Sequence, residues 1–187
     1  AATDAWTTAA GRPCVVMAHG FGATKDAGLT PFAERFAAAG ADVVLFDYRG
    51  FGTSGGTPRQ QVDHRRHRAD YRSVVSQVRA MEGIDPDRVV LWGSSYSGGH
   101  VVAVAAGDPR VAGVISQGAA MDGLAAVVEI VKYTGVTQLL RLTGHALRGV
   151  VQRDYSIPIV AAPGELAAIT SHDGLSGYEI IMGPTFE

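Results

Sequence analysis

The fold of this chain is decided by the stretch Val89-Val90-Leu91-Trp92-Gly93-Ser94-Ser95-Tyr96-Ser97-Gly98-Gly99-His100. A short apolar run leads into a cluster of glycines and serines, and the small residues of 101–106 follow with a composition that a helix accepts. We therefore predict a buried strand, a very tight turn and a helix. Ser95 is the central residue of this turn. The turn matches G-x-S-x-G up to Ser95, and Ser97 takes the place of the second glycine.

A serine on such a corner is placed as a nucleophile. The small neighbours let the backbone fold back on itself, so that the hydroxyl stands clear of the sheet. The backbone N–H of Tyr96 would lie at a helix N-terminus, aimed at developing negative charge. The alternative is a glycine- and serine-rich turn with no chemical role.

Outward from this stretch, apolar runs alternate with helical patterns from residue 14 to residue 117. This alternation predicts a mostly parallel sheet in a three-layer α/β/α sandwich, with ligands bound beyond the carboxyl ends of the strands. The expected strands cover 14–19, 41–47, 89–94 and 111–116, and the expected helices 30–39, 60–82 and 96–106.

The second part of the chain differs in composition. Residues 121–156 show helical periodicity with breaks at Gly135, Gly144 and Gly149, which we interpret as a helical lid over the strand ends. The alternative is one ordinary crossover helix. We accordingly divide the chain into a core over 1–120, the lid over 121–156 and a return segment over 157–187. In the return segment we expect a short helix at 165–171 and a strand at 178–182.

Composition limits the possible functions. The 187 residues are 47% hydrophobic and 18% charged, with a net charge of −2. These values indicate a globular protein and give no basic excess for a nucleic-acid partner. No uninterrupted apolar run reaches the roughly 18 residues of a membrane span. No signal peptide is visible, so we expect a cytoplasmic protein that acts on a small molecule. The sequence does not determine the oligomeric state.

Two other patterns resemble binding sites. The glycines of 50–55 match a dinucleotide-binding fingerprint, but the sequence Thr57-Pro58-Arg59 separates them from the next helix. His64 and His67 are three residues apart within a basic run and lack a supporting carboxylate–histidine motif, so we interpret the run as a solvated helix face. We therefore predict neither an organic cofactor nor a metal.

Together, three motifs resemble the α/β-hydrolase superfamily. They are His19-Gly20-Phe21-Gly22, then Asp47-Tyr48-Arg49-Gly50-Phe51-Gly52-Thr53-Ser54-Gly55, then Gly93-Ser94-Ser95-Tyr96-Ser97-Gly98-Gly99. The chain looks most like the bacterial branch of X-prolyl dipeptidyl peptidases and dienelactone-hydrolase-type esterases. The resemblance implies Ser95 as the nucleophile, the amides of Phe21 and Tyr96 as the oxyanion hole, and a structural role for residues 47–55. It also implies hydrolysis of an ester or related acyl bond through an acyl-enzyme, and the apolar lid favours a small to medium apolar substrate.

The chain departs from this family after Ser95, because the acidic residues and histidines that follow do not have the expected spacing. The expected order is serine, then acid, then histidine on later loops. Asp122 with His172 is one possible pair, although His172 also fits a plain polar turn. We expect the acid and the histidine to lie on strands beyond residue 187. The alternative function is a non-catalytic or truncated relative that binds a ligand.

Overall fold

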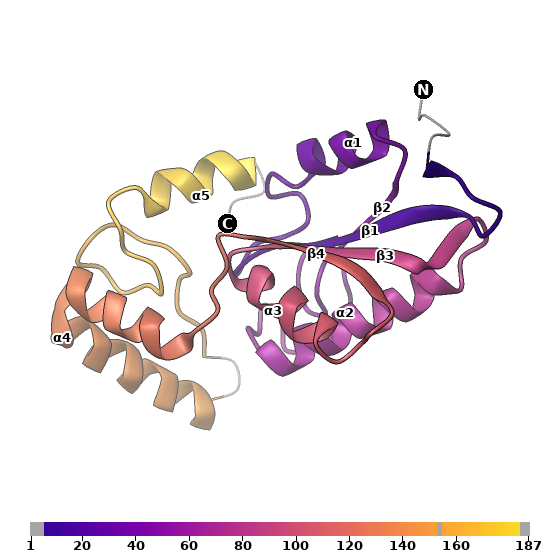
Figure 1. Ribbon diagram of the computed structural model, residues 1–187. Helices are drawn as coiled ribbons and strands as arrows, with labels where there is room; N and C mark the ends of the chain where they lie inside the picture. The colour runs from indigo at the N-terminus through magenta and orange to yellow at the C-terminus, as the bar shows by residue number, and fades with distance from the viewer. Residues whose placement is uncertain (1–5, 153–154, 184–187) are drawn as a thin grey trace. The chain divides into compact units, whose positions relative to one another are not determined.

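The computed structural model describes residues 6–152 and 155–183 (Figure 1). The chain divides into two compact units, Ala1–Met121 and Asp122–Glu187. The described part of the first unit contains β1 (Arg12–Ala18), α1 (Thr30–Ala38), β2 (Asp42–Phe46), α2 (His64–Arg79), β3 (Ile84–Ser94), α3 (Tyr96–Ala105) and β4 (Val111–Gln117).

The four strands form one parallel sheet in the order β2-β1-β3-β4. Because successive side chains of a strand point to opposite faces, β1 supplies both halves of the core. Cys14 and Val16 pack with residues of α2 and α3, whereas Val15 and Met17 pack with residues of α1 and the segment before it. Figure 1 shows α1 on one face of the sheet and α2 and α3 on the other. The predicted α/β/α sandwich with a parallel sheet is confirmed.

The strand register brings the functional motifs to one edge of the sheet. Ala18 of β1 pairs with Phe46 of β2 and with Gly93 of β3, and Gly93 pairs with Ser116 of β4. Ser94 of β3 then pairs with Gln117 of β4, so the first residues after the four strands leave the sheet at the same edge. They are His19, Asp47, Ser95 and Gly118.

The predicted helix over 60–82 is shorter in the structure. It begins at His64 because the Asp63 carboxylate accepts hydrogen bonds from the backbone N–H groups of Arg65 and Arg66, which fixes the first turn. Gln60 has φ 56°, a left-handed conformation that a helix excludes.

The second unit begins with α4 (Gly123–Val151), which is kinked at Gly135. Gly135 has φ 80° and ψ 166°, a conformation that glycine adopts without strain. The predicted breaks at Gly144 and Gly149 were wrong, since both residues are helical. A glycine inside a helix costs only about 1 kcal/mol, which does not by itself end the helix.

By length and composition alone, α4 is apolar enough to cross a membrane. The kink weakens this inference, because the parts 123–134 and 136–151 are each shorter than the roughly 20 residues that a span needs.

The rest of the second unit differs from the expectation. Residues 165–168 form bends, not a helix, and Val160 makes an isolated parallel bridge with Ile169. The predicted strand at 178–182 was wrong, because α5 (Gly174–Met182) is a helix. Residues 184–187 of the predicted return segment and residues 1–5 of the predicted core lie outside the described residues.

Candidate active site at the carboxyl ends of the strands

Ser95 connects β3 directly to α3 in a strained backbone conformation. Its φ of 54° and ψ of −117° are unusual for a residue with a side chain, and such conformations cost on the order of 1–3 kcal/mol. The Ser95 N–H donates to the carbonyl of Gln117 at 2.9 Å, and the Ser95 carbonyl accepts from the N–H groups of Gly98 and Ala120. Backbone segments of the same chain thus hold the turn in place on both sides.

The glycines around Ser95 are needed for close backbone approach. A Cβ on Gly93 would lie 2.4 Å from the carbonyl oxygen of Ser97, and a Cβ on Gly99 would lie 2.4 Å from that of Ala120. Both distances are far below van der Waals contact. The small residues that the sequence places here are therefore a steric requirement of the turn.

Ser97 replaces the second glycine of the motif and contributes its hydroxyl. Its Oγ accepts from the Ser94 N–H at 2.9 Å and lies 2.9 Å from the carbonyl of Ala18 and 3.1 Å from that of Ser94. A hydroxyl has one proton, so it donates to one of these carbonyls at a time. This buried contact ties the end of β1 to the Ser95 turn.

Phe21 and Tyr96 meet next to Ser95. Their rings are 5.7 Å apart in an edge-to-face arrangement. Tyr96 is the first residue of α3, so its N–H is one of those that have no acceptor within the helix. An ideal Cβ on Gly20 would lie 3.5 Å from Cβ of Ser95, which shows how closely the loop that carries Phe21 approaches the turn.

Asp47 links the loops after β1 and β2. Its buried carboxylate accepts from the backbone N–H and the ammonium of Lys25, at 2.6 and 2.8 Å, and from the N–H of Thr53 at 3.1 Å. Burial raises the pKa of Asp47, but these hydrogen bonds outweigh burial and hold the pKa below its usual value of 3.8. Lys25 follows Phe21 by four residues, so Asp47 anchors the loop that carries Phe21.

His19 is a buried neutral imidazole at the end of β1. Burial lowers its pKa from 6.5 to about 4. Its Nδ1 lies 3.0 Å from the carbonyl of Gly20, and its Nε2 lies 3.5 Å from the N–H of Tyr48. A proton on Nδ1 satisfies both contacts, because Nδ1–H then donates to Gly20 and Nε2 accepts from Tyr48.

Asp122 and His172, the possible triad partners, both belong to the second unit. The Asp122 carboxylate caps α4 by accepting from the N–H groups of Leu124 and Ala125. His172 lies in the turn before α5 and lines a cavity of about 890 Å³. The role of the pair in catalysis stays a prediction.

The cavity in the second unit is mainly apolar. Ile130 and Leu142 of α4 line one part of it, and the segment 163–173 lines the rest. Its charged lining side chains are the carboxylates of Glu129 and Asp173, and no lysine or arginine is among its lining residues. This charge distribution favours a neutral ligand over a carboxylate.

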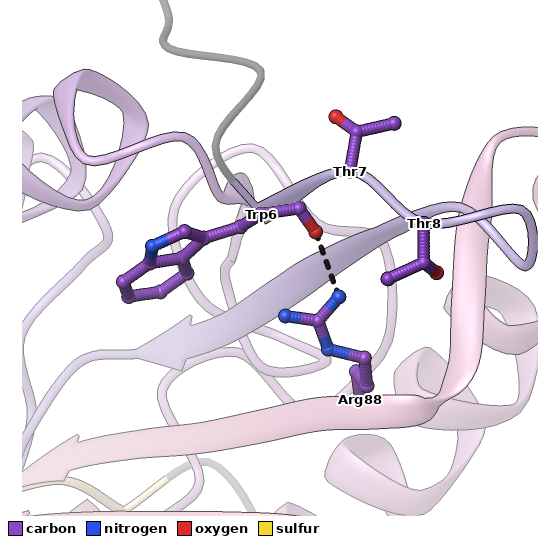
Figure 2. A pocket seen from close by; sticks show the side chains of 4 residues that line it. All are labelled: Trp6, Thr7, Thr8 and Arg88. Atoms are coloured by element: carbon purple, nitrogen blue, oxygen red, sulfur yellow. Dashed lines mark hydrogen bonds between the residues drawn. The ribbon is translucent and has the colours of Figure 1, made fainter.

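A second hollow, of about 360 Å³, lies in the first unit and is lined by Trp6, Thr7, Thr8 and Arg88. Figure 2 shows Arg88 of β3 reaching the Trp6 carbonyl, to which its Nη1 donates at 2.7 Å. Arg88 precedes the apolar run of β3, so the hollow is remote along the strand from the carboxyl edge where parallel sheets bind ligands.

His67 was assigned incorrectly from the sequence. It is 1% exposed and stacks on Tyr48 with ring centroids 4.0 Å apart, so it is not part of a solvated face. The signal was present, because His67, Tyr71, Val75 and Val78 recur at helical spacing and share the buried face of α2.

Two ionic contacts were also missed. Lys25 pairs with Asp47. Asp70 accepts from the backbone N–H and the guanidinium of Arg49. Both contacts join residues more than twenty positions apart, and helix or strand periodicity does not reveal such pairs.

The glycines of 50–55 form a structural loop. A Cβ on Gly52 would lie 2.2 Å from the Asp47 carboxylate, so the glycine makes room for that anchor. The next helix begins only at His64, whereas a dinucleotide fingerprint opens a helix directly. Within residues 6–152 and 155–183, no three histidine, cysteine, aspartate or glutamate side chains gather to hold a metal ion.

Comparison with known proteins agrees with this geometry. The family "Serine aminopeptidase, S33" matches residues 9–169. The quorum-quenching protein AidA of Acinetobacter baumannii (strain MDR-ZJ06) is 40% identical over 181 residues, which are 94% of this chain and 58% of AidA. The thiohydrolase aneE of Aspergillus aculeatus (strain ATCC 16872 / CBS 172.66 / WB 5094) is 44% identical over 104 residues, or 56% of this chain and 33% of aneE.

A solved structure extends the likeness. The α/β hydrolase GrgF from Penicillium sp. sh18 has a TM-score of 0.68 and 26% identity, over 82% of this chain and 52% of GrgF. The chain thus spans between a third and three fifths of the length of these relatives. On the family match and the shared fold, the chain belongs to the serine aminopeptidase S33 family of the α/β-hydrolase superfamily.

Proposed function

We propose that the protein is a serine hydrolase that cleaves an ester or a related acyl bond through an acyl-enzyme on Ser95. The observation that carries this proposal is the backbone of Ser95, which is held at φ 54° between β3 and α3 by hydrogen bonds from both sides. A non-glycine residue with this conformation is costly, and such strain is concentrated at functional sites. The turn presents the hydroxyl beyond the carboxyl edge of a parallel sheet, where ligands bind.

The amides of Phe21 and Tyr96 are the proposed donors to the oxyanion. Attack by Ser95 Oγ on a carbonyl carbon breaks the C=O π bond and places negative charge on the oxygen, which preorganised N–H donors stabilise. The contact between the Phe21 and Tyr96 rings and the close approach of Gly20 to Ser95 support this assignment. The serine proton must pass to a base for the attack to proceed.

The proposed substrate is small to medium, apolar and neutral. The apolar cavity of the second unit, with carboxylates as its charged lining, supports this substrate class. A helical lid formed by the second unit is part of the proposal, as is the finer relationship to X-prolyl dipeptidyl peptidases and dienelactone-hydrolase-type esterases. Thiohydrolase activity is stated for the relative aneE, so thioesters belong to the acyl compounds to be tested.

Labelling with a fluorophosphonate probe tests the nucleophile, because the probe phosphonylates only an activated serine. The test uses the protein at the full length of its gene, so that any acid and base outside residues 1–187 are present. The parent protein should be labelled, Ser95→Ala should not, and Ser94→Ala is the matched control because it changes the preceding hydroxyl of the same turn. Peptide mapping of the labelled protein should place the phosphonyl group on Ser95. Equal labelling of the parent and Ser95→Ala, or no labelling of the parent, contradicts the proposal.

The second candidate function is ligand binding without catalysis. The cavity in the second unit supports it, because its lining lies within residues 126–173 and does not involve Ser95. A protein of this kind would bind a neutral acyl compound in equilibrium dialysis and release it unchanged. Release of the hydrolysed product would exclude this alternative.

A further inference from the structure

Five rings form a continuous group, which we call the ring belt: the buried His19, Tyr48, His67 and His100, and the half-buried Tyr96. The centroid distances between successive members are 4.7 Å for His19–Tyr48, 4.0 Å for Tyr48–His67, 5.7 Å for His67–His100 and 4.4 Å for His100–Tyr96. Aromatic pairs at these separations attract one another. The belt therefore connects residues from the end of β1, the loop after β2, α2 and α3.

The two ends of the ring belt are at the proposed oxyanion donors. Tyr96 contributes one amide itself and contacts the ring of Phe21. Phe21 contributes the other amide and follows His19, the opposite end of the belt, by two residues. The contacts thus form a closed circuit, in which the separation of the two amides is tied to the packing of His67 and His100.

The middle of the circuit tolerates no charge. Both ring nitrogens of His67 and Nε2 of His100 are buried without a hydrogen-bond partner of normal geometry among the described residues. Burial lowers the pKa of His67, which the nearby Gln61 backbone opposes only in part, and burial lowers the pKa of His100 to about 4. An imidazolium at His100 would lose its hydration without gaining a favourable partner, and at His67 the favourable groups offset the lost hydration only in part.

The surrounding charges differ for the two residues. Asp63 and Asp70 favour a proton on His67, whereas Arg66 opposes it. His67, Arg68 and His64 all oppose a proton on His100. From the other elements, His19, Tyr48 and Tyr96 face the pair, and His67 opposes a proton on His19.

We propose that His67 and His100 are positioning residues for the hydrolysis proposed above: as neutral rings they hold the amides of Phe21 and Tyr96 in place, and a proton on either ring releases them. This inference rests on the proposed function for its effect on catalysis. The two rings are not proposed to contact the substrate or Ser95, and they act through Tyr96. A buried imidazole without a hydrogen-bond partner lowers the stability of the fold relative to an apolar ring of the same size. In return, the imidazole makes the position of the two amides sensitive to acid.

Three variants distinguish the effect of packing the His67 ring from the effect of protonating it. His67→Phe keeps a ring that cannot be protonated, His67→Ala removes the ring, and His64→Ala is the control on the exposed start of the same helix. At pH 7.5 we expect His67→Phe and His64→Ala to label with fluorophosphonate at about the parent rate. We expect His67→Ala to label about 10²-fold more slowly, the cost typical of a lost oxyanion donor. In ester hydrolysis the loss should appear in kcat with KM unchanged.

A second measurement follows the acid-induced loss of packing in the ring belt directly. Near-ultraviolet circular dichroism reports the packing of tyrosine rings and can be recorded in Ser95→Ala, so it does not depend on catalysis. Between pH 7 and pH 3.5 the signal should be lost in Ser95→Ala, and the midpoint should move to lower pH when His67→Phe is added. Far-ultraviolet spectra and urea unfolding at pH 7.5 check that each variant is folded.

The outcomes are distinguishable. Parent-like labelling of folded His67→Ala overturns the positioning role, and an unchanged midpoint in His67→Phe overturns the acid release. If His67→Ala does not fold, slow labelling of folded His67→Phe decides against the inference, because a ring of matched shape should suffice. Equal labelling of the parent and Ser95→Ala overturns the proposed function instead, and the dichroism result then still tests the ring belt by itself.

Discussion

The carboxylate of Asp47 accepts hydrogen bonds from both the backbone N–H and the side-chain ammonium of Lys25. One acidic residue at the end of β2 therefore fixes two points of the loop that follows β1. Because this loop also carries Phe21, the geometry around Ser95 depends on a buried charge that is not itself a candidate for chemistry.

The first prediction concerns this anchor. Asp47→Asn replaces an acceptor oxygen with an NH₂ group that cannot accept from Lys25, so we expect a loss of about 2–4 kcal/mol in the free energy of unfolding, near the range for breaking a buried pair. Asp87→Asn is the control, because the Asp87–Arg110 pair is largely exposed and should cost about 0.5 kcal/mol or less. Urea unfolding measures both. Equal losses in the two variants would show that Asp47 is no anchor.

The second prediction is the dependence of stability on pH. His19 and His100 have pKa values of about 4 in the folded protein against the ordinary value of 6.5, so between these pH values the unfolded chain binds more protons. The free energy of unfolding is therefore highest above about pH 6.5, and it falls progressively as the pH drops to about 4, because the unfolded chain takes up protons that the buried rings resist. Asp47, whose pKa is lowered, adds a further loss below about pH 4. Urea unfolding at pH 7.5, 5.5 and 4 checks this, and constant stability over that range would refute it.

The third prediction compares two glycines. Gly93→Ala would place Cβ 2.4 Å from the Ser97 carbonyl oxygen, and the turn must move to accept it. We expect a loss of stability on the order of 3 kcal/mol, as for other overpacked sites, together with a loss of fluorophosphonate labelling. Gly55→Ala is the control, because no atom lies within 4 Å of its Cβ position. A parent-like midpoint for Gly93→Ala in urea would contradict the steric account.

The fourth prediction concerns the base. Asp122 caps α4 and His172 lies in a polar turn, so we expect His172→Ala and Asp122→Asn to label within about twofold of the parent rate. Asparagine keeps the N-cap of α4, so Asp122→Asn removes charge without removing the cap. Removing a true general base typically costs at least about 10²-fold. A loss of that size in His172→Ala would identify His172 as the base.

The fifth prediction concerns the charge of the ligand. With Glu129 and Asp173 as the charged lining of the cavity, neutral acyl esters should bind to it better than dicarboxylate half-esters of the same length. Asp173→Asn should narrow this difference, because it removes one repulsive charge. Glu34→Gln is the control, since Glu34 belongs to α1 in the first unit. Dissociation constants for the paired compounds measure the effect, and no preference in the parent would count against the neutral ligand class.

The alternation of strands and helices was predictable because continuous apolar runs and helical spacing are local patterns. The segment 178–182 was not, because a short apolar run occurs equally in a strand and in a helix, and α5 forms there. Gly144 and Gly149 were misjudged because the break at Gly135 depends on its backbone angles, which composition does not give.

For the candidate site, the corner at Ser95 followed from its small neighbours. The anchoring by Asp47 and the ring belt did not, because they join residues far apart in the chain. The acid and base partners of Ser95 remain predictions from the family pattern.

Ser97 has a consequence for engineering. Changing Ser97 to glycine would restore the common form of the motif, and a design based on family frequencies would select it. In this protein the change would deprive the Ser94 N–H of its acceptor and the Ala18 carbonyl of a donor. Each buried group left unpaired costs about 1–3 kcal/mol. The substitution that looks most conservative for the motif would therefore be an unfavourable one for this chain.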